Sequence, residues 1–376
     1  MWRFQLLYER LRKDTRFETV IVVYPFPGAP EVQDKDMAEL LDFFSRKGIP
    51  VLNLHKRPNP GKCLREVVNP DLIFYSQQYN NLYGNDLDNK FFLDKLIAYI
   101  PYAMVVFQEA WLDRNTLNEI AWRMFFPSES RKQQAIKIQY NKGYNIRVTG
   151  DPMLDFFKSP MEKTTWKKQV LTKKKIIWAP HFSLQKDSLL HHNSFSWLHN
   201  LMLEIADYYK DQLQFSFKPH PRLLKSLYEM PDWGKEKADA YFQAWDEGEN
   251  TQLDTGLYID LFKGSDAMIH DCGSFTAEYL LTGNPVLFTT KDFEAVFAQL
   301  NQMGQEAIQA HYISDSKTQI INFIEKIVLE GQDPLKEKRD AFYKKYLCLP
   351  SGKSVAENIY NEIVFGLGWE ASRKTT

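Results

Sequence analysis

The sequence predicts an α/β protein made of two Rossmann-like, doubly wound domains, and three observations lead to this class. The chain has 376 residues, whereas an ordinary domain has ~100–200. β-Branched apolar runs alternate with helical patterns in both halves, which is typical of parallel sheets built from βαβ units. A polar, lysine-rich stretch around residues 151–174 divides the two runs and suits a linker.

The first half begins with a helix rather than with a strand. Residues 2–11 form an amphipathic helical pattern, and a β-branched strand at 17–26 follows. Because a doubly wound domain usually begins with a strand, we expect a first strand to be missing, through an N-terminal truncation or a misplaced start codon. The further apolar segments expected as strands are 49–54, 69–79 and 95–107, the last of which holds one or two strands, and the expected helices are 35–48 and 113–124. The segments 122–130 and 145–153 are short apolar pieces that end in turn residues.

The second half repeats this alternation and ends in helices. The apolar runs expected as strands are 174–183, 213–221, 251–256, 266–274 and 284–290, and the helical patterns are 196–211, 234–248, 257–265, 275–283, 334–346 and 353–367. We therefore expect an N-terminal domain over 1–160, a C-terminal nucleotide-donor domain over 174–350, and a terminal helix in 351–376 that crosses back to the first domain.

Composition excludes several classes of protein. Lys and Arg number 47 against 48 Asp and Glu, so the basic stripe of a nucleic-acid binder is not expected. Three scattered cysteines without a CxxC pair argue against a disulfide framework or a zinc site and favour a reducing cytoplasm. No apolar run approaches the roughly 18 residues that span a bilayer. The GxGxxG, GxxxxGK[ST] and GxSxG motifs are absent.

Candidate site residues follow the predicted strands, since ligands of parallel sheets bind beyond the carboxyl ends of the strands. The segment "WAPHFS" places His181 after one strand, and "KPHP" holds His220 between two prolines after the next, with Lys218 before it. We expect His220 to donate to a pyrophosphate oxygen or to stabilise charge on the leaving nucleotide. Arg222 adds a cation that can pair with phosphate. The candidate catalytic residues are His220, His181 and Asp271.

The segment "DCGSFTAEYLLTG" (271–283) marks a turn from a strand into a helix. Gly273 permits close approach of the backbone, and the amides and dipole at the helix N-terminus bind phosphate oxygens. Ser274 and Glu278 share one helix face, so Glu278 can reach a ribose hydroxyl. An ordinary capped helix is the alternative interpretation. The candidate nucleotide-binding residues are Lys218, Arg222, Gly273, Ser274, Phe275, Thr276 and Glu278.

The other polar groups suggest an acceptor site but no metal site. In the first half, the segments 75–81, 99–103 and 148–155 follow strands, and Asp151 or Glu109 is a candidate base. The remaining histidines have no carboxylate at ligand spacing, so we predict no metal ligands and no required cofactor. Mg²⁺ stays open as a companion of the donor.

Together these motifs resemble CDP-glycerol glycerophosphotransferases. The resemblance rests on "KIIWAPHFS", "FSFKPHP" and "FKGSDAMIHDCGSFTAEYLLTGNPVLF"; it extends from about residue 3 to 365 and is strongest over 174–290. It implies a GT-B fold, whose two domains face a central cleft. It also implies that His220 works at the donor pyrophosphate and that Ser274, between Gly273 and Phe275, lies in the phosphate-binding turn.

The chain departs from the family pattern at several positions. The N-terminal Trp-His-Gly motif, whose histidine is the family's proposed acceptor base, is absent, and "YIPYA" lies near its expected place. His270 and Gly273 replace the more usual Thr or Ser and Ser.

The expected activity is transfer of glycerol phosphate from CDP-glycerol to a hydroxyl of a cell-surface polymer, such as teichoic acid or capsule, or of its lipid-linked precursor. Alternatives are a GT-B glycosyltransferase that uses a UDP- or CDP-sugar and a non-catalytic nucleotide-binding relative. The expected location is the cytoplasm, and the lysine-rich stretch from Lys163 to Lys175 with Trp166 suggests peripheral contact with the inner face of the membrane, although a solvated linker is the alternative.

Overall fold

A computed structural model describes residues 2–25, 30–77, 86–108, 115–161, 165–184, 193–348 and 352–369. The chain divides into two compact units. The first contains Met1–Tyr102, Glu109–Pro152 and Leu349–Thr376, and the second contains Ala103–Gln108 and Met153–Cys348. A six-residue segment of the N-terminal half therefore belongs to the second unit, and the C-terminal segment belongs to the first.

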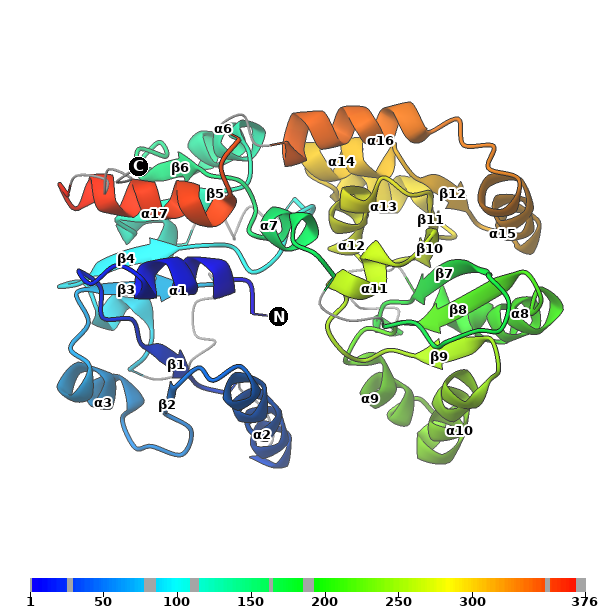
Figure 1. Ribbon diagram of the computed structural model, residues 1–376, viewed down its shortest axis with the longest axis horizontal. Helices are drawn as coiled ribbons and strands as arrows, with labels where there is room; N and C mark the ends of the chain where they lie inside the picture. Colours follow the sequence, from blue (N-terminus) through cyan, green and yellow to red (C-terminus); the bar gives the residue numbers. More distant parts are fainter. Residues whose placement is uncertain are drawn as a thin grey trace. The chain divides into compact units, whose positions relative to one another are not determined.

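The second unit is built on a six-stranded parallel sheet (Figure 1). Its order is β12-β11-β10-β7-β8-β9, so the chain starts in the middle and winds outward to each side in turn. This is the order of a doubly wound Rossmann sheet, with its switch point between β7 and β10. The strands are β7 (Lys174–Ala179), β8 (Leu213–Phe217), β9 (Thr251–Leu253), β10 (Ala267–His270), β11 (Val286–Thr289) and β12 (Tyr312–Ser314).

A helix follows each of these strands. Three of the helices continue into turns of another type: a 3₁₀ turn, η2, follows α12, and π-helical turns, η3 and η4, follow α15 and α16. The helices are α7 (Met153–Lys158), α8 (Phe195–Tyr208), α9 (Leu223–Tyr228), α10 (Gly234–Glu247), α11 (Ile259–Lys263), α12 (Phe275–Glu278), η2 (Tyr279–Thr282), α13 (Phe293–Gln299), α14 (Gln302–Ile308), α15 (Lys317–Asn322), η3 (Phe323–Leu329), α16 (Lys336–Phe342) and η4 (Tyr343–Leu347).

Aromatic side chains fill the core between the central strands and their helices. Every residue of β8 is buried, as expected for a central strand covered on both faces. Trp178 of β7 stacks on Phe217 of β8 with ring centroids 5.0 Å apart, and its ring lies 5.4 Å from that of Trp245 on α10. This packing fixes the carboxyl ends of β7 and β8, where the candidate site begins.

The first unit contains two parallel sheets in its described part. One has the sequential order β3-β4-β5-β6, and the other pairs β1 with β2. The single doubly wound sheet expected for this half is therefore divided. β1 and β2 have three residues each, and Val22 of β1 faces solvent, so one face of the pair is left open. The strands are β1 (Ile21–Val23), β2 (Val51–Asn53), β3 (Leu72–Tyr75), β4 (Leu96–Tyr99), β5 (Arg123–Phe126) and β6 (Ile146–Val148).

The first and last helices of the chain pack on one another in this unit (Figure 1). Arg10 lies 4.7 Å over the ring of Tyr360 and forms an ion pair with Glu357. Tyr360 also donates to Asp14 over 2.6 Å. The helices are α1 (Gln5–Arg12), α2 (Pro30–Arg46), α3 (Pro60–Val67), η1 (Asn89–Phe91), α5 (Thr116–Ile120), α6 (Glu129–Ile138) and α17 (Val355–Gly366).

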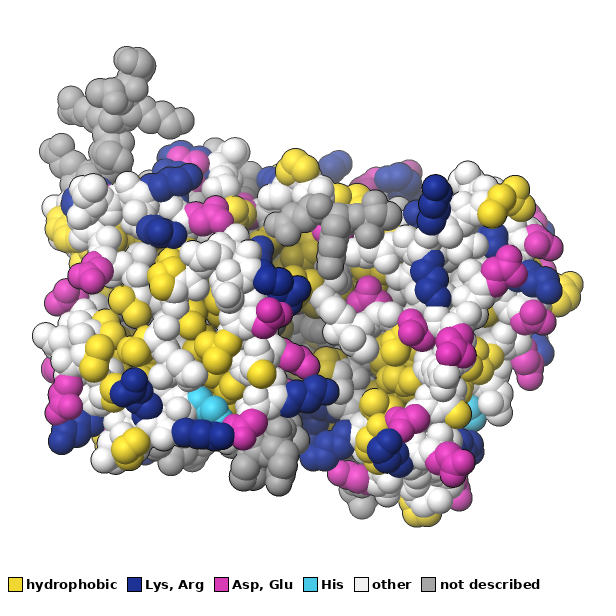
Figure 2. Space-filling view, turned by 60° about the horizontal axis from the view of Figure 1, so that its bottom comes forward, with side chains coloured by type: hydrophobic (Ala, Val, Ile, Leu, Met, Phe, Trp, Pro, Cys, Tyr) yellow, Lys and Arg dark blue, Asp and Glu magenta, His cyan; other side chains and the backbone are white. Residues whose placement is uncertain are grey.

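The surface carries both signs of charge. Figure 2 shows acidic and basic side chains interspersed over the face in view. In the described part of the chain, no helix combines the length and the apolar character that a bilayer span requires.

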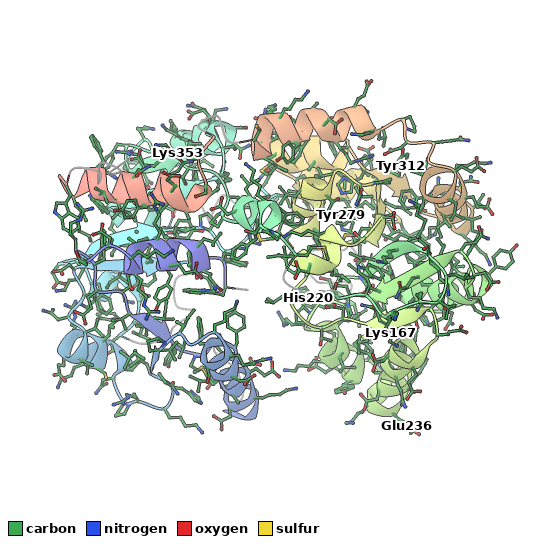
Figure 3. The ribbon with its side chains drawn as sticks, in the orientation of Figure 1. Lys167, His220, Glu236, Tyr279, Tyr312 and Lys353 are labelled. Carbon is green, nitrogen blue, oxygen red and sulfur yellow. The ribbon has the colours of Figure 1, made fainter. Side chains whose placement is uncertain are left out.

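The lysine-rich stretch belongs to the second unit, and its described part packs within that unit. Trp166 is buried and donates through Nε1 to the backbone oxygen of Leu261 over 3.2 Å. Lys167, labelled in Figure 3, donates to the backbone oxygen of Asp246. The buried Trp166 ring is therefore not available to a membrane, and membrane contact through the lysines of this stretch stays a prediction.

Candidate functional site

The topology of the second unit brings the sequence-predicted residues to one edge of its sheet. β10, β7 and β8 are neighbours, and all three run parallel. The segments after them begin with Asp271, Pro180 and Lys218. In open parallel sheets, ligands bind outside the carboxyl ends at the switch point, which here lies between β7 and β10.

The two histidines lie close together at this edge. The ring centroids of His181 and His220 are 5.1 Å apart, and the amide of His220 donates to the oxygen of Pro180 over 3.1 Å. The Phe182 ring lies 4.4 Å from each of them. The Arg222 guanidinium lies 4.5 Å over this phenyl ring. The structure therefore groups His181, His220 and Arg222, as the sequence predicted.

His220 is arranged to act as a neutral hydrogen-bond donor. Burial, with the charges of Arg222 and Lys218, lowers the pKa of His220 to about 4. The Arg222 amide donates to Nδ1 of His220 over 3.2 Å. Since Nδ1 accepts this bond, the single proton of the neutral ring resides on Nε2. Nε2–H can then donate to an anion at pH 7. Figure 3 shows His220 beyond the end of β8.

The turn between β10 and α12 presents backbone amides. Within the described residues, the N–H groups of Gly273, Ser274 and Phe275 donate to no acceptor, and the Ser274 hydroxyl does not cap the helix. Three consecutive amides without acceptors at the start of a helix can bind an anion. Thr276 is buried and donates to the backbone oxygen of Cys272 over 3.2 Å, so its hydroxyl is already occupied.

Gly273 is close to an aromatic ring that the sequence analysis did not identify. A Cβ at this position would lie 2.2 Å from Cε2 of Phe107. Phe107 belongs to the segment 103–108, which Asn301 fixes by donating hydrogen bonds. Its Nδ2–H donates to the oxygens of Val105 over 2.8 Å and Phe107 over 3.2 Å, and its backbone N–H donates to the oxygen of Val106 over 2.9 Å. Sequence reasoning explained Gly273 by the approach of a phosphate. The structure adds a second reason, which is the approach of the Phe107 ring.

Asp271 is an internal anchor. Its side chain is fully buried and accepts from the amide of His181 over 2.5 Å. It also accepts from the amide and the hydroxyl of Ser194 over 2.6 and 2.8 Å. Burial raises the pKa of Asp271 to about 7, and these donors act in the opposite direction. Such a group cannot reach a substrate, so the structure does not support the catalytic role expected for Asp271 and indicates a positioning role instead.

Lys218 and Glu278 are also engaged inside the unit. The Lys218 ammonium donates to the oxygen of Gly256 over 2.8 Å and lies 3.5 Å from the Asp254 carboxylate. Burial lowers the pKa of Lys218. The buried Glu278 carboxylate accepts from the Tyr258 hydroxyl. Both side chains therefore already have polar partners inside the unit, as buried polar groups require, and their contacts to a nucleotide stay predictions.

The first unit provides no comparable cluster in its described part. Asp151 is buried and pairs with Arg3 over 3.2 Å, so it is not available as the acceptor base. Glu109 lies outside the described residues, as do 78–81 of the expected acceptor segment. Tyr99 is buried and Tyr102 is exposed.

Among the described residues, no group of three or more metal-ligating side chains lies together. His199 contacts the oxygen of Phe195 through Nδ1 over 3.1 Å. His270 and His311 are buried with ring centroids 5.3 Å apart. His191 and His192 lie outside the described part.

Comparison with known proteins identifies the family. The sequence model of the CDP-glycerol:poly(glycerophosphate) glycerophosphotransferase family matches residues 107–365. The chain belongs to this family. It is therefore a transferase, as the resemblance implied, although the match begins at 107 rather than near residue 3. Comparison with curated protein sequences finds no match.

Solved structures share the fold at low sequence identity. The Staphylococcus aureus MnaA–UDP structure has a TM-score of 0.62 at 15 % identity and covers 98 % of this chain and 94 % of its own. The UDP-GlcNAc 2-epimerase from Neisseria meningitidis bound to UDP-GlcNAc has 0.60 at 16 %, covering 96 % of each chain. A CDPG-soaked structure of the wall teichoic acid polymerase TagF has 0.57 at 14 %, covering 85 % and 79 %. The predicted GT-B-type α/β class is confirmed.

Proposed function

We propose that this transferase moves glycerol phosphate from CDP-glycerol to a hydroxyl of a cell-surface polymer or of its lipid-linked precursor. The observation that carries the proposal is the pairing of two anion-binding features at one sheet edge. They are the unpaired amides of Gly273–Phe275 and the Nε2–H of neutral His220. The family to which the chain belongs supplies the donor class.

The proposed reaction is a displacement at phosphorus. The acceptor hydroxyl oxygen forms a bond to the phosphorus that carries glycerol, and the bond from this phosphorus to the bridging oxygen breaks. CMP leaves with the bridging electrons, and the hydroxyl proton passes to a base that the described residues do not identify. The amides and His220 stabilise the negative charge that develops on the diphosphate. Positioning and electrostatics supply most of the rate in such reactions.

The spacing of the strands supports this arrangement. β10 and β8 flank β7, and neighbouring strands lie ~4.8 Å apart, so the two features are about 10 Å apart across the sheet edge. His181 lies between them, after β7. Arg222, an exposed cation beside the His220 ring, can approach a phosphate that lies above this edge. A lipid-linked acceptor and a nucleotide donor would meet at the inner face of the membrane, where we place the activity.

Release of CMP from CDP-glycerol in the presence of acceptor tests the proposal. We expect turnover by the wild type and a loss of roughly 100-fold or more in kcat for His220→Ala, because a preorganised donor is removed. His199→Ala is the matched control, since His199 lies on α8 with its Nδ1 at the Phe195 oxygen, and its kcat should equal that of the wild type. Equal kcat for the His220 and wild-type proteins would contradict the role of His220.

A thermal-shift panel of nucleotides distinguishes the donors. CMP, CDP and CDP-glycerol should raise the melting temperature, and UDP should have a smaller effect. Stabilisation by UDP but not by CMP or CDP would reject CDP-glycerol and favour a glycosyltransferase that uses a UDP-sugar.

A further inference from the structure

Two helices, α8 and α12, follow the strands on either side of the switch point of the second unit, and the start of either helix could hold a phosphate. The helix after β7 is α8, and the helix after β10 is α12. In doubly wound sheets that bind dinucleotides, the pyrophosphate lies after the first of these strands, against the helix N-terminus. By that rule α8, a helix of 14 residues, would be the phosphate-binding helix.

Two amides at the N-terminus of α8, those of Ser194 and Ser196, already donate to side-chain oxygen atoms of the chain itself. Asp271 Oδ2 accepts from the amide of Ser194 over 2.6 Å and from its hydroxyl over 2.8 Å. The Asn193 side chain accepts from the amide of Ser196 over 3.3 Å. The Thr289 hydroxyl donates to the Ser194 hydroxyl over 2.8 Å, which orients the Ser194 proton toward Asp271. A carboxylate at a helix N-terminus meets the same partial charge that would attract a phosphate.

The turn from β10 to α12 differs in that its amides are free to bind an anion. Its amides at Gly273, Ser274 and Phe275 have no acceptor within the described residues. Asp271 lies two residues before this turn, and its other oxygen, Oδ1, accepts from the amide of His181. One buried carboxylate therefore binds the amide of Ser194 at the start of α8 and anchors the backbone of His181 beside His220.

We propose that Asp271 takes the place of a phosphate at the N-terminus of α8 and thereby directs the donor diphosphate to the Gly273–Phe275 turn. Asp271 is a positioning residue in this account. Its negative charge repels an anion from the N-terminus of α8, so that the donor diphosphate binds in one position only. This inference rests on the proposed function and adds the reason why the turn before α12, and not the start of α8, receives the donor.

The test compares Asp271→Asn with Asp266→Asn. Asp266 precedes the amino end of the same strand and accepts from the amide of Lys175 in β7 over 2.9 Å, much as Asp271 accepts from the amide of His181 beyond the carboxyl end of β7. Asp266 therefore makes the same kind of bond to a backbone amide as Asp271, but it lies at the opposite end of the strand from the switch point. Assays are run at pH 8, above the pKa of Asp271. For Asp271→Asn we expect kcat with CDP-glycerol to fall at least tenfold, because part of the donor binds at α8 and is misplaced for the reaction. The affinity for CDP should change less than threefold, because the total binding is retained. Asp266→Asn should keep the wild-type kcat.

Crystals soaked with CDP provide the readout that a general loss of stability would not move. In the wild type the diphosphate should lie at the Gly273–Phe275 turn with no anion at α8, and in Asp271→Asn it should occupy the α8 N-terminus in part or fully. A wild-type diphosphate at α8 overturns the inference, whether or not the variant folds. Wild-type kcat in Asp271→Asn, or an unmoved diphosphate in that variant, also overturns it. Absence of any CDP binding or turnover in the wild type instead refutes the proposed function.

Discussion

Gly273→Ala tests whether the Phe107 ring lies against the donor turn. The φ angle of Gly273 is outside the positive range, so alanine is compatible with its backbone. The added Cβ would, however, lie 2.2 Å from Cε2 and 2.7 Å from Cζ of Phe107. Relief requires the ring to move, and forcing extra atoms into a packed site typically costs about 1–3 kcal/mol. We expect Gly273→Ala to lower the free energy of unfolding by about 2 kcal/mol.

A double-mutant cycle isolates this contact. In the Phe107→Ala background the ring is absent, so Gly273→Ala should cost less than about 1 kcal/mol, and the coupling energy should exceed about 1 kcal/mol. Unfolding in urea is measured for the four proteins. Gly256→Ala is the control, because its nearest atom is 3.9 Å from the new Cβ, and it should be neutral or slightly stabilising. An equal cost of Gly273→Ala in both backgrounds would refute the packing that we describe.

Two further predictions concern buried ionisable groups. Asp254→Ala leaves the Lys218 ammonium buried without its carboxylate, which should lower the free energy of unfolding by about 3 kcal/mol. In urea unfolding, the double variant with Lys218→Met should recover part of this loss, and no recovery would contradict the ion pair. Burial lowers the pKa of His311 from 6.5 to about 3, so its contribution to stability is present above pH 6.5 and is lost as the pH falls toward 3. Between pH 7.5 and 5 the wild type should therefore lose about 2 kcal/mol that His311→Gln does not lose, and parallel pH profiles of the two proteins would count against a neutral buried ring.

The sequence analysis located the strand ends of the second unit because β7, β8 and β10 are continuous apolar runs that stop at polar residues. His181, His220 and Gly273 follow from this pattern, since parallel strands deliver their carboxyl ends to one edge. The partners of these residues could not be inferred in the same way. Asp271 meets Ser194 because β10 lies beside β7 in the sheet, a pairing that a single sequence does not reveal.

Phe107 and Trp166 show where local patterns mislead. Phe107 ends an apolar run that resembles a strand of the first half, yet its segment pairs with Leu300 of the second unit. Trp166 lies among lysines, as in a membrane-binding segment, but its ring packs into the second unit. In both cases long-range packing decides the position of a side chain whose neighbours in sequence suggest another environment.

The central claim is that the donor diphosphate lies on the amides of Gly273–Phe275 with the His220 Nε2–H facing it. A crystal structure of the wild type with bound CDP tests this most directly. The account predicts phosphate oxygens within hydrogen-bonding distance of those amides and of Nε2. A diphosphate bound elsewhere in the second unit, or a His220 ring that faces away from it, would contradict the account.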